Sequence, residues 1–262
     1  MQNNTFSTLF VGQNLIKLSA VDSTNNFLKM MLSKSEPLPE GTVIMADNQY
    51  AGRGQQENTW HAEPGLNLTI SILLKPSFLS INRQFMLNIA VSNGIGKALK
   101  ALVETGITVK WPNDLYHYDR KIGGVLIENS ISGSVIKSSI VGIGLNVNQK
   151  RFDPFQVKTA VSLSEILQED VNLLSLLSEI CGHIEAQYLK LKSNNDVSLH
   201  EDYITSLYKF GRPALYRQNG ETFEGKIVDV TAQGLMVIDV NGVNRAYNFK
   251  EVEFLSDLHL EG

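Results

Sequence analysis

Apolar and polar residues alternate along several short stretches of the first 150 residues, the pattern of strands that bury one face. The clearest run is Leu66–Ile72, in which Asn67, Thr69 and Ser71 separate apolar neighbours. The same reasoning predicts further strands at residues 14–21, 42–46, 106–109, 122–128 and 135–146.

Apolar residues spaced three and four positions apart predict helices around these strands. Asp22, Ser23 and Thr24 offer capping side chains to a helix that carries Leu28 and Met31 on one face. Longer helices are predicted at residues 81–104, 172–192 and 198–209, and residues 153–170 are expected to be irregular. The order of elements predicts a domain that combines helices and strands.

The pattern changes after Gly211-Arg212-Pro213. Short alternating runs are then separated by Asn219-Gly220, Gln233-Gly234 and Asn241-Gly242, pairs that favour hairpin turns. Residues 211–258 are therefore expected to form a small all-β barrel, appended to the larger domain.

Composition narrows the class of protein. Of the 262 residues 43% are hydrophobic and 19% charged, as in globular proteins with a sizeable core. The net charge of −4 argues against broad nucleic-acid binding, and no apolar stretch is long enough to span a membrane. The N-terminus lacks a signal-peptide pattern. The single cysteine, Cys181, excludes an internal disulfide, which fits a reducing cytoplasm. Its thiol is expected to pack in the core. No histidine pair has metal-ligand spacing, so no protein-built metal site is expected.

Candidate chemistry begins at Lys110-Trp111-Pro112-Asn113-Asp114, directly after a predicted strand that Pro112 ends. Lys121-Ile122-Gly123-Gly124 then opens another strand. Two strand ends thereby aim two ammonium groups and one carboxylate at one space. Such a space suits a phosphate-bearing substrate, because transfer of phosphoryl or adenylyl groups depends on fixed cations.

A second feature is the loop Gly52-Arg53-Gly54-Gln55-Gln56-Glu57-Asn58-Thr59-Trp60, in which backbone amides and a guanidinium are free to surround an anion. A plain surface loop is the alternative, and Trp60 is either a loop anchor or a stacking platform. Ser23-Thr24-Asn25 is either a helix cap or a hydrogen-bonding set for a small polar ring. Gln49, at the exit of a strand, is either a surface residue or a planar amide that donates to and accepts from a ligand. Asn146 is either a turn residue or a nucleotide contact.

Taken in order, these motifs closely resemble those of the biotin protein ligases. The resemblance covers most of residues 14–150 and rests on Ser23-Thr24-Asn25, Gly52-Arg53-Gly54 with Trp60, Lys110–Asp114, Lys121–Gly124 and Gly142-Ile143-Gly144-Leu145-Asn146. It implies an α+β fold: a mixed-sheet catalytic domain at residues 1–209 and a small SH3-like β-barrel at residues 210–262. It also implies an enzyme that joins biotin to the α-phosphate of ATP, releases pyrophosphate, and passes biotin from biotinyl-5′-AMP to one lysine of a biotin carboxyl carrier protein.

The resemblance implies roles for individual residues. The catalytic set is Arg53, Lys110, Asp114 and Lys121. The implied biotin contacts are Ser23, Thr24, Asn25, Gln49, Gly52, Arg53, Gly54, Gln55, Lys121, Gly123 and Gly124. The implied nucleotide contacts are Arg53, Gln56, Trp60, Lys110, Asn113, Lys121 and Asn146. Mg²⁺ is expected on the ATP phosphates and not on protein ligands.

The chain departs from many relatives, which carry arginine where it has Gln55 and Gln56, and glycine where it has Glu57. Fewer cations predict a weaker hold on the adenylate phosphate and a loop that is mobile without ligand. About twenty residues precede Ser23, too few for the winged-helix DNA-binding domain of some relatives, so no DNA partner is expected. A homodimer remains an open alternative.

Two other functions are weighed against this one. A lipoate or octanoate ligase resembles the same fold, but lacks the Lys-Trp-Pro-Asn-Asp segment and favours an arginine–serine–glycine-rich loop. A non-catalytic biotin or nucleotide sensor is the other alternative. Retention of Arg53, Lys110 and Lys121 together argues against a sensor, because binding alone needs fewer cations.

Overall fold

The computed structural model describes residues 6–34, 37–55, 58–153 and 159–255. Within these ranges a seven-stranded mixed sheet has the strand order β1-β2-β3-β7-β6-β5-β4. The parallel pair β1 and β2 is joined through helix α1, and the other neighbours are antiparallel. The strands are β1 (Leu15–Val21), β2 (Val43–Gln49), β3 (Leu68–Leu74), β4 (Ile107–Lys110), β5 (Asp114–His117), β6 (Arg120–Ser132) and β7 (Val135–Leu145).

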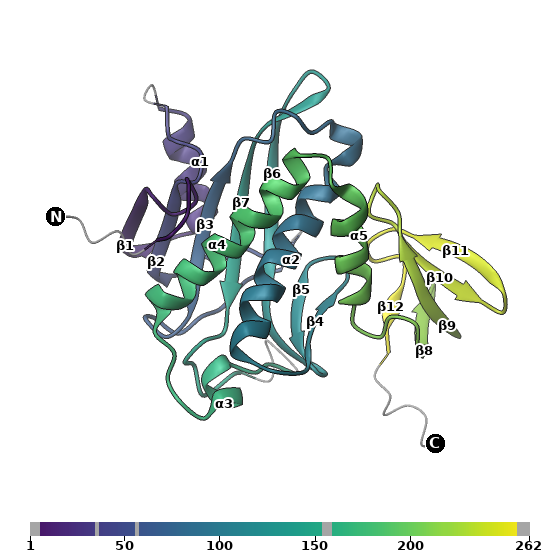
Figure 1. Cartoon of the computed structure of the whole chain (residues 1–262). Helices are drawn as coiled ribbons and strands as arrows, with labels where there is room; N and C mark the ends of the chain where they lie inside the picture. Colours follow the sequence, from purple (N-terminus) through teal and green to yellow (C-terminus); the bar gives the residue numbers. More distant parts are fainter. Residues whose placement is uncertain (1–5, 35–36, 56–57, 154–158, 256–262) are drawn as a thin grey trace.

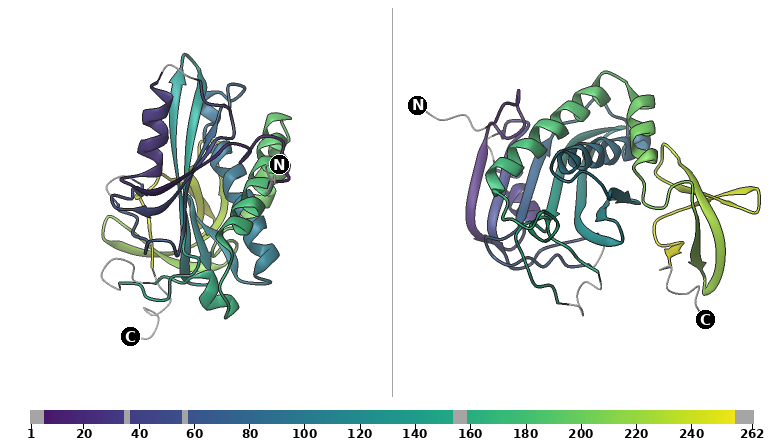
Figure 2. Two further views of the ribbon diagram at one scale, coloured as in Figure 1. Left: turned by 90° about the vertical axis from the view of Figure 1, so that its left-hand side faces the viewer. Right: turned by 60° about the horizontal axis from the view of Figure 1, so that its bottom comes forward.

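Helices cover both faces of this sheet, which explains why every residue of the interior strand β3 is buried. One face carries α2 (Phe85–Leu102), α4 (Leu173–Lys192) and α5 (Asp196–Thr205), and the other carries α1 (Thr24–Leu32) (Figures 1 and 2). Helix α1 packs on the sheet through a small apolar cluster of Leu28, Ile44, Leu73 and Ile140. The main core lies under α2 and α4.

The predicted strands and long helices are confirmed, with shifted ends. The helix expected at 81–104 begins as a separate turn, η1 (Ile81–Arg83), before α2, and the helix expected at 198–209 lies at 196–205. Two short elements escaped prediction: β5, which has four residues, and α3 (Leu163–Leu167), which lies in the stretch expected to be irregular. Both are too short to show a periodicity.

The C-terminal residues form a second, five-stranded antiparallel sheet in the order β11-β10-β9-β8-β12. Asn219-Gly220 and Asn241-Gly242 turn two of its hairpins with positive φ at all four residues, as the sequence predicted. The expected all-β unit is therefore confirmed, with β11 and β12 at the ends of the strand order. The strands are β8 (Pro213–Gln218), β9 (Glu221–Val230), β10 (Met236–Val240), β11 (Val243–Tyr247) and β12 (Glu253–Phe254).

The two sheets are joined by side-chain contacts. The indole N–H of Trp111 donates to the backbone carbonyl of Gly234 over 3.0 Å, and Nε2 of His200 lies 2.7 Å from the carbonyl of Val230. Buried residues of both sheets belong to one core cluster. The two predicted domains therefore share one hydrophobic core. The domain boundary between residues 209 and 210 stays a prediction.

Helix α4 also holds residues 9–11, ahead of β1. The buried carboxylate of Glu185 accepts hydrogen bonds from the backbone N–H groups of Leu9, Phe10 and Val11 at 2.7, 2.8 and 3.0 Å. One helical turn away, burial raises the pKa of the Cys181 thiol to about 12, with the Glu185 charge adding to the shift. Among the described residues no helix has the length and apolar character needed to cross a bilayer.

Candidate active site

A cavity of about 580 Å³ lies between the seven-stranded sheet, the described residues of the 52–60 loop and the second sheet. This volume is in the range of small-molecule sites. Strands β3, β6 and β7 supply its floor, and the second sheet adds Phe249, Lys250, Val252, Glu253 and Phe254. Residues predicted for the site that line the cavity are Ser23, Thr24, Asn25, Gln49, Arg53, Gly54, Gln55, Trp60, Lys110, Asn113, Asp114, Lys121 and Gly124.

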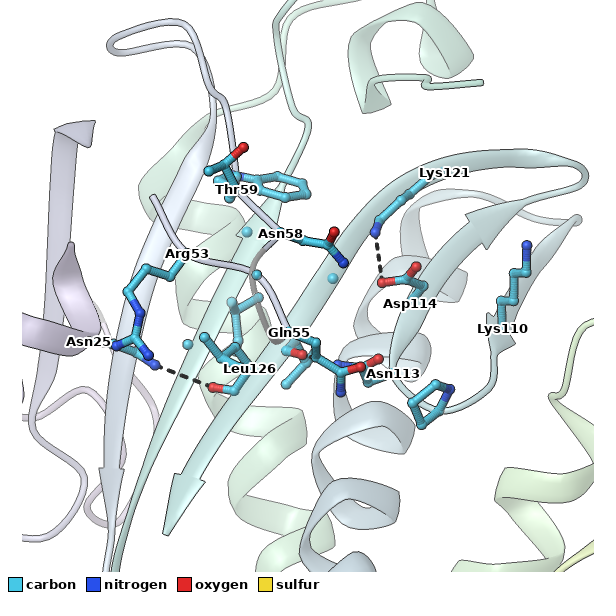
Figure 3. Close-up of a pocket in the computed structure, with 18 of the residues that line it drawn as sticks. Asn25, Arg53, Gln55, Asn58, Thr59, Lys110, Asn113, Asp114, Lys121 and Leu126 are labelled. Atoms are coloured by element: carbon cyan, nitrogen blue, oxygen red, sulfur yellow. Dashed lines mark hydrogen bonds and ion pairs between the residues drawn. The ribbon is translucent and has the colours of Figure 1, made fainter. Parts of the chain in front are cut away.

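At one end of the cavity the Lys121 ammonium lies 2.8 Å from Oδ1 of Asp114 (Figure 3). Asp114 begins β5 opposite Gly124 of β6, and a Cβ at Gly124 would lie 3.0 Å from Asp114 Oδ1. The glycine therefore leaves room for the pair. Both side chains remain partly exposed, at 26% for Lys121 and 32% for Asp114, so a ligand in the cavity can reach them.

The turn between β4 and β5 is held from several sides. The side-chain amide of Asn113 donates to the carbonyl of Val125, whose N–H donates back to the carbonyl of Asn113 over 3.1 Å. The Pro112 carbonyl, next to a cis Trp111–Pro112 peptide bond, accepts from Asn88 and Tyr203 over 2.8 Å each. These bonds fix the direction in which the turn presents Asp114.

Lys110 lies apart from the Lys121–Asp114 ion pair, surrounded by aromatic rings. Its ammonium is 5.0 Å from the ring centre of Tyr116, 5.1 Å from that of Phe254 and 5.9 Å from that of Tyr208. Such contacts stabilise a cation, especially a desolvated one. Burial lowers the pKa of Lys110, an effect that Asp114 opposes and Lys121 reinforces.

The other end of the cavity is lined by neutral hydrogen-bonding groups together with the charged side chain of Arg53. Oε1 of Gln49 accepts from the backbone N–H of Thr24 over 2.9 Å. Gln49 therefore caps α1. Ser23 occupies the N-cap position, as one of its two interpretations had it, but its side chain makes no cap hydrogen bond. Ser71 was missed by the sequence analysis: its buried Oγ lies 2.8 Å from Thr24 Oγ1 and 2.6 Å from Asn25 Oδ1.

Arg53 lies at this end, and its partner, Glu128, was also missed. Nη2 of Arg53 donates to Oε1 of Glu128 over 3.1 Å, and Nη1 donates to Oε2 over 3.2 Å and to Asn26 Oδ1 over 2.8 Å. Figure 3 shows Arg53 beside Asn25 on one side of the cavity, with Lys121 and Asp114 on the other. The only sequence signal for Glu128 is a carboxylate at the end of an apolar run.

Trp60 anchors the loop to the sheet. Its backbone N–H donates to the Gly52 carbonyl over 2.9 Å, and a Cβ at Gly144 would lie 2.4 Å from its indole ring. A Cβ at Gly142 would likewise lie 2.4 Å from Oδ1 of Asn25. The absence of a Cβ at these two β7 glycines therefore lets the side chains of Trp60 and Asn25 lie directly against the strand backbone.

Four predicted site residues stand outside this lining. The buried amide of Asn146 lies 3.4 Å from the Lys121 carbonyl and 3.3 Å from the Val161 carbonyl, so it tethers backbone. Gly123 packs against β7, where a Cβ would lie 2.6 Å from the Gly144 carbonyl oxygen. Gly52 leaves space for the side-chain amide of Gln49, because a Cβ at Gly52 would lie 2.5 Å from Gln49 Nε2. Gln56 lies outside the described residues.

Comparison with known proteins relates the chain to ligases. Residues 18–146 match the biotin/lipoate A/B protein ligase family. The chain is 30% identical over 247 residues to the bifunctional ligase/repressor BirA of Bacillus subtilis, covering 92% of this chain and 74% of that protein. It is 26% identical over 211 residues to the biotin–[acetyl-CoA-carboxylase] ligase of Mycobacterium tuberculosis, covering 78% and 75%. A solved structure of the biotin protein ligase from Aquifex aeolicus in complex with biotin and ATP has a TM-score of 0.77 and 27% identity, over 92% of this chain and 98% of that chain.

Proposed function

The chain belongs to the biotin protein ligase family, and we propose that it activates biotin with ATP and transfers it to a lysine of a biotin carboxyl carrier protein. In the first step a biotin carboxylate oxygen attacks the α-phosphorus, and the bond to pyrophosphate breaks. In the second step the acceptor amine attacks the acyl carbon, loses a proton and releases AMP. The M. tuberculosis relative is named for acetyl-CoA carboxylase, and we propose a carrier of that kind here.

The observation that carries the proposal is the Lys121–Asp114 pair at 2.8 Å, in one cavity with the partly buried cation Lys110 and with the polar residues Ser23, Thr24 and Gln49. The carboxylate of biotin is itself the nucleophile, so no protein nucleophile is required. What the reaction does require is cations that stabilise the charge of two approaching anions. Mg²⁺ would arrive on the ATP phosphates and share that task, and no protein ligand is assigned to it.

The residues that line the cavity can be assigned to the different parts of the two substrates. Lys121 and Lys110 would bind the carboxylate and α-phosphate oxygens, and Asp114 would orient Lys121 and accept a proton from the incoming amine. Ser23, Thr24 and Gln49 would face the ureido ring of biotin at the other end of the cavity, with Gly124 and apolar strand residues along the ligand. The described part of the 52–60 loop would cover the adenylate through Gly54 and Gln55.

Exchange of labelled pyrophosphate into ATP tests the proposal, because it reports reversible adenylate formation without any acceptor. Purified protein, Mg²⁺ and biotin should give exchange, and lipoate in place of biotin should give none. Exchange with lipoate alone would move the chain to lipoate activation. Biotin binding without exchange would indicate a sensor.

A further inference from the structure

Glu128 holds two segments that are distant in the sequence. Its carboxylate accepts three N–H bonds, two from Arg53 in the 52–60 loop and one of 2.8 Å from Asn25 Nδ2 at the start of α1. Both segments line the same end of the cavity. One carboxylate on β6 therefore fixes the separation between the loop and the helix start.

The bond to Asn25 decides which way the Asn25 amide faces. The residue is 3% exposed, and its Oδ1 lies 2.6 Å from Ser71 Oγ. Its Nδ2 has one close acceptor, Glu128, and one distant acceptor, the Leu126 carbonyl at 3.4 Å. Because a buried donor without an acceptor is costly, the carboxylate keeps the amide in this orientation.

The bonds to Arg53 decide where the loop lies. Arg53 pairs with Thr59 across the neck of the loop, and the Gly54 N–H donates to the Asn58 carbonyl over 2.7 Å. An isolated pair that is 41% and 24% exposed would contribute little. Here the guanidinium is shared with Asn26 and the carboxylate with Asn25, which makes the pair part of a network.

We infer that Glu128 is a positioning residue for biotin binding, and that it acts through Arg53 and Asn25. This inference rests on the proposed function. It assigns to the Arg53 guanidinium the task of holding the loop against β6, while Gly54 and Gln55 line the cavity in which biotin would bind. The charge chemistry at Lys121 and Asp114 lies on the other side of the cavity (Figure 3), so it does not depend on Glu128.

The test uses E128Q, R53Q, the double variant and a matched control, E165Q. The control breaks a 2.5 Å ion pair between Arg120, at the start of the same strand, and Glu165, and neither residue lines the cavity. Calorimetry gives the Kd of biotin, and pyrophosphate exchange gives kcat and the KM of each substrate. Thermal unfolding checks that each variant is folded.

E128Q should raise the Kd and KM of biotin about tenfold, the effect of losing a charged hydrogen-bond network, while kcat and the KM of ATP stay within about twofold. The Kd of biotin should rise by a similar factor in R53Q, and it should rise no further in the double variant, because all three variants break one network. E165Q should behave as the unaltered protein.

Unchanged biotin affinity in E128Q would overturn the inference, as would a loss confined to kcat or additive effects in the double variant. An unaltered protein that binds no biotin would overturn the proposed function and, with it, the inference. The two failures are distinguishable because one is measured on the variants and the other on the unaltered chain.

Discussion

The ammonium of Lys110 lies 5.1 Å from the ring centre of Phe254, and the two residues belong to different sheets. Lys110 ends β4 of the large sheet, and Phe254 lies in β12 of the second. The second sheet is thus part of the wall around a cation that the proposed reaction uses. The bond from Trp111 to Gly234 fixes the neighbouring turn against the same sheet.

Replacing Phe254 with leucine should weaken the site while keeping its apolar cover. The variant loses one cation–π contact, so kcat/KM for ATP in pyrophosphate exchange should fall about two- to fivefold, with biotin affinity unchanged. Phe223→Leu is the matched control, because Phe223 stacks on Tyr216 in the same sheet, at 5.6 Å, and is not one of the three described rings around the Lys110 ammonium. Equal losses in the two variants would mean that the second sheet acts only through its stability.

The pH profile should report the buried state of Lys110. Because burial lowers the pKa of Lys110, its positive charge is lost at a lower pH than that of an exposed lysine. Exchange should therefore decline on the alkaline side, at a pH below the usual lysine range. Phe254→Ala admits water to the ammonium and should move that decline to higher pH. If exchange declined at the same alkaline pH in the variant and in the unaltered protein, deprotonation of Lys110 would not be the cause of the decline.

Lys121→Ala should abolish most adenylate formation without unfolding the chain. The substitution removes a cation from the reacting groups and leaves Asp114 unpaired, and exchange should fall by at least about a hundredfold. Its neighbour on β6, Arg120, pairs with Glu165 outside the cavity, so Arg120→Ala is the control and should retain activity. Unchanged turnover in Lys121→Ala would remove Lys121 from the mechanism.

Two glycines of α2 should respond oppositely to alanine. A Cβ at Gly94 would lie 2.7 Å from the Cα of Ile184 on α4, so Gly94→Ala should lower the free energy of unfolding by about 2 kcal/mol. Gly96 has open space around its Cβ position, and Gly96→Ala should gain about 0.5–1 kcal/mol of helix propensity. Urea unfolding measures both. A Gly94→Ala protein as stable as Gly96→Ala would show that the two helices separate at little cost.

The sequence predicted what local patterns encode. Alternation located the strands, Asn-Gly pairs located hairpins, and the motifs Lys110–Asp114 and Lys121–Gly124 beside two predicted strands indicated the place where Lys121 and Asp114 pair. The residues that escaped prediction depend on contacts between distant segments. Glu128 bonds to a residue 103 positions away, and Ser71 and Phe254 act through pairings that no local pattern reveals. The expected mobility of the loop in the absence of ligand stays a prediction.

Transfer of biotin to a carrier tests the central claim most directly. The purified protein would be incubated with ATP, Mg²⁺, biotin and an unmodified biotin carboxyl carrier domain, and the domain's intact mass followed. The account predicts a gain of one biotinyl group, lost when the acceptor lysine is replaced by arginine and absent when lipoate replaces biotin. An unchanged carrier mass with biotin, or modification by lipoate instead, would contradict it.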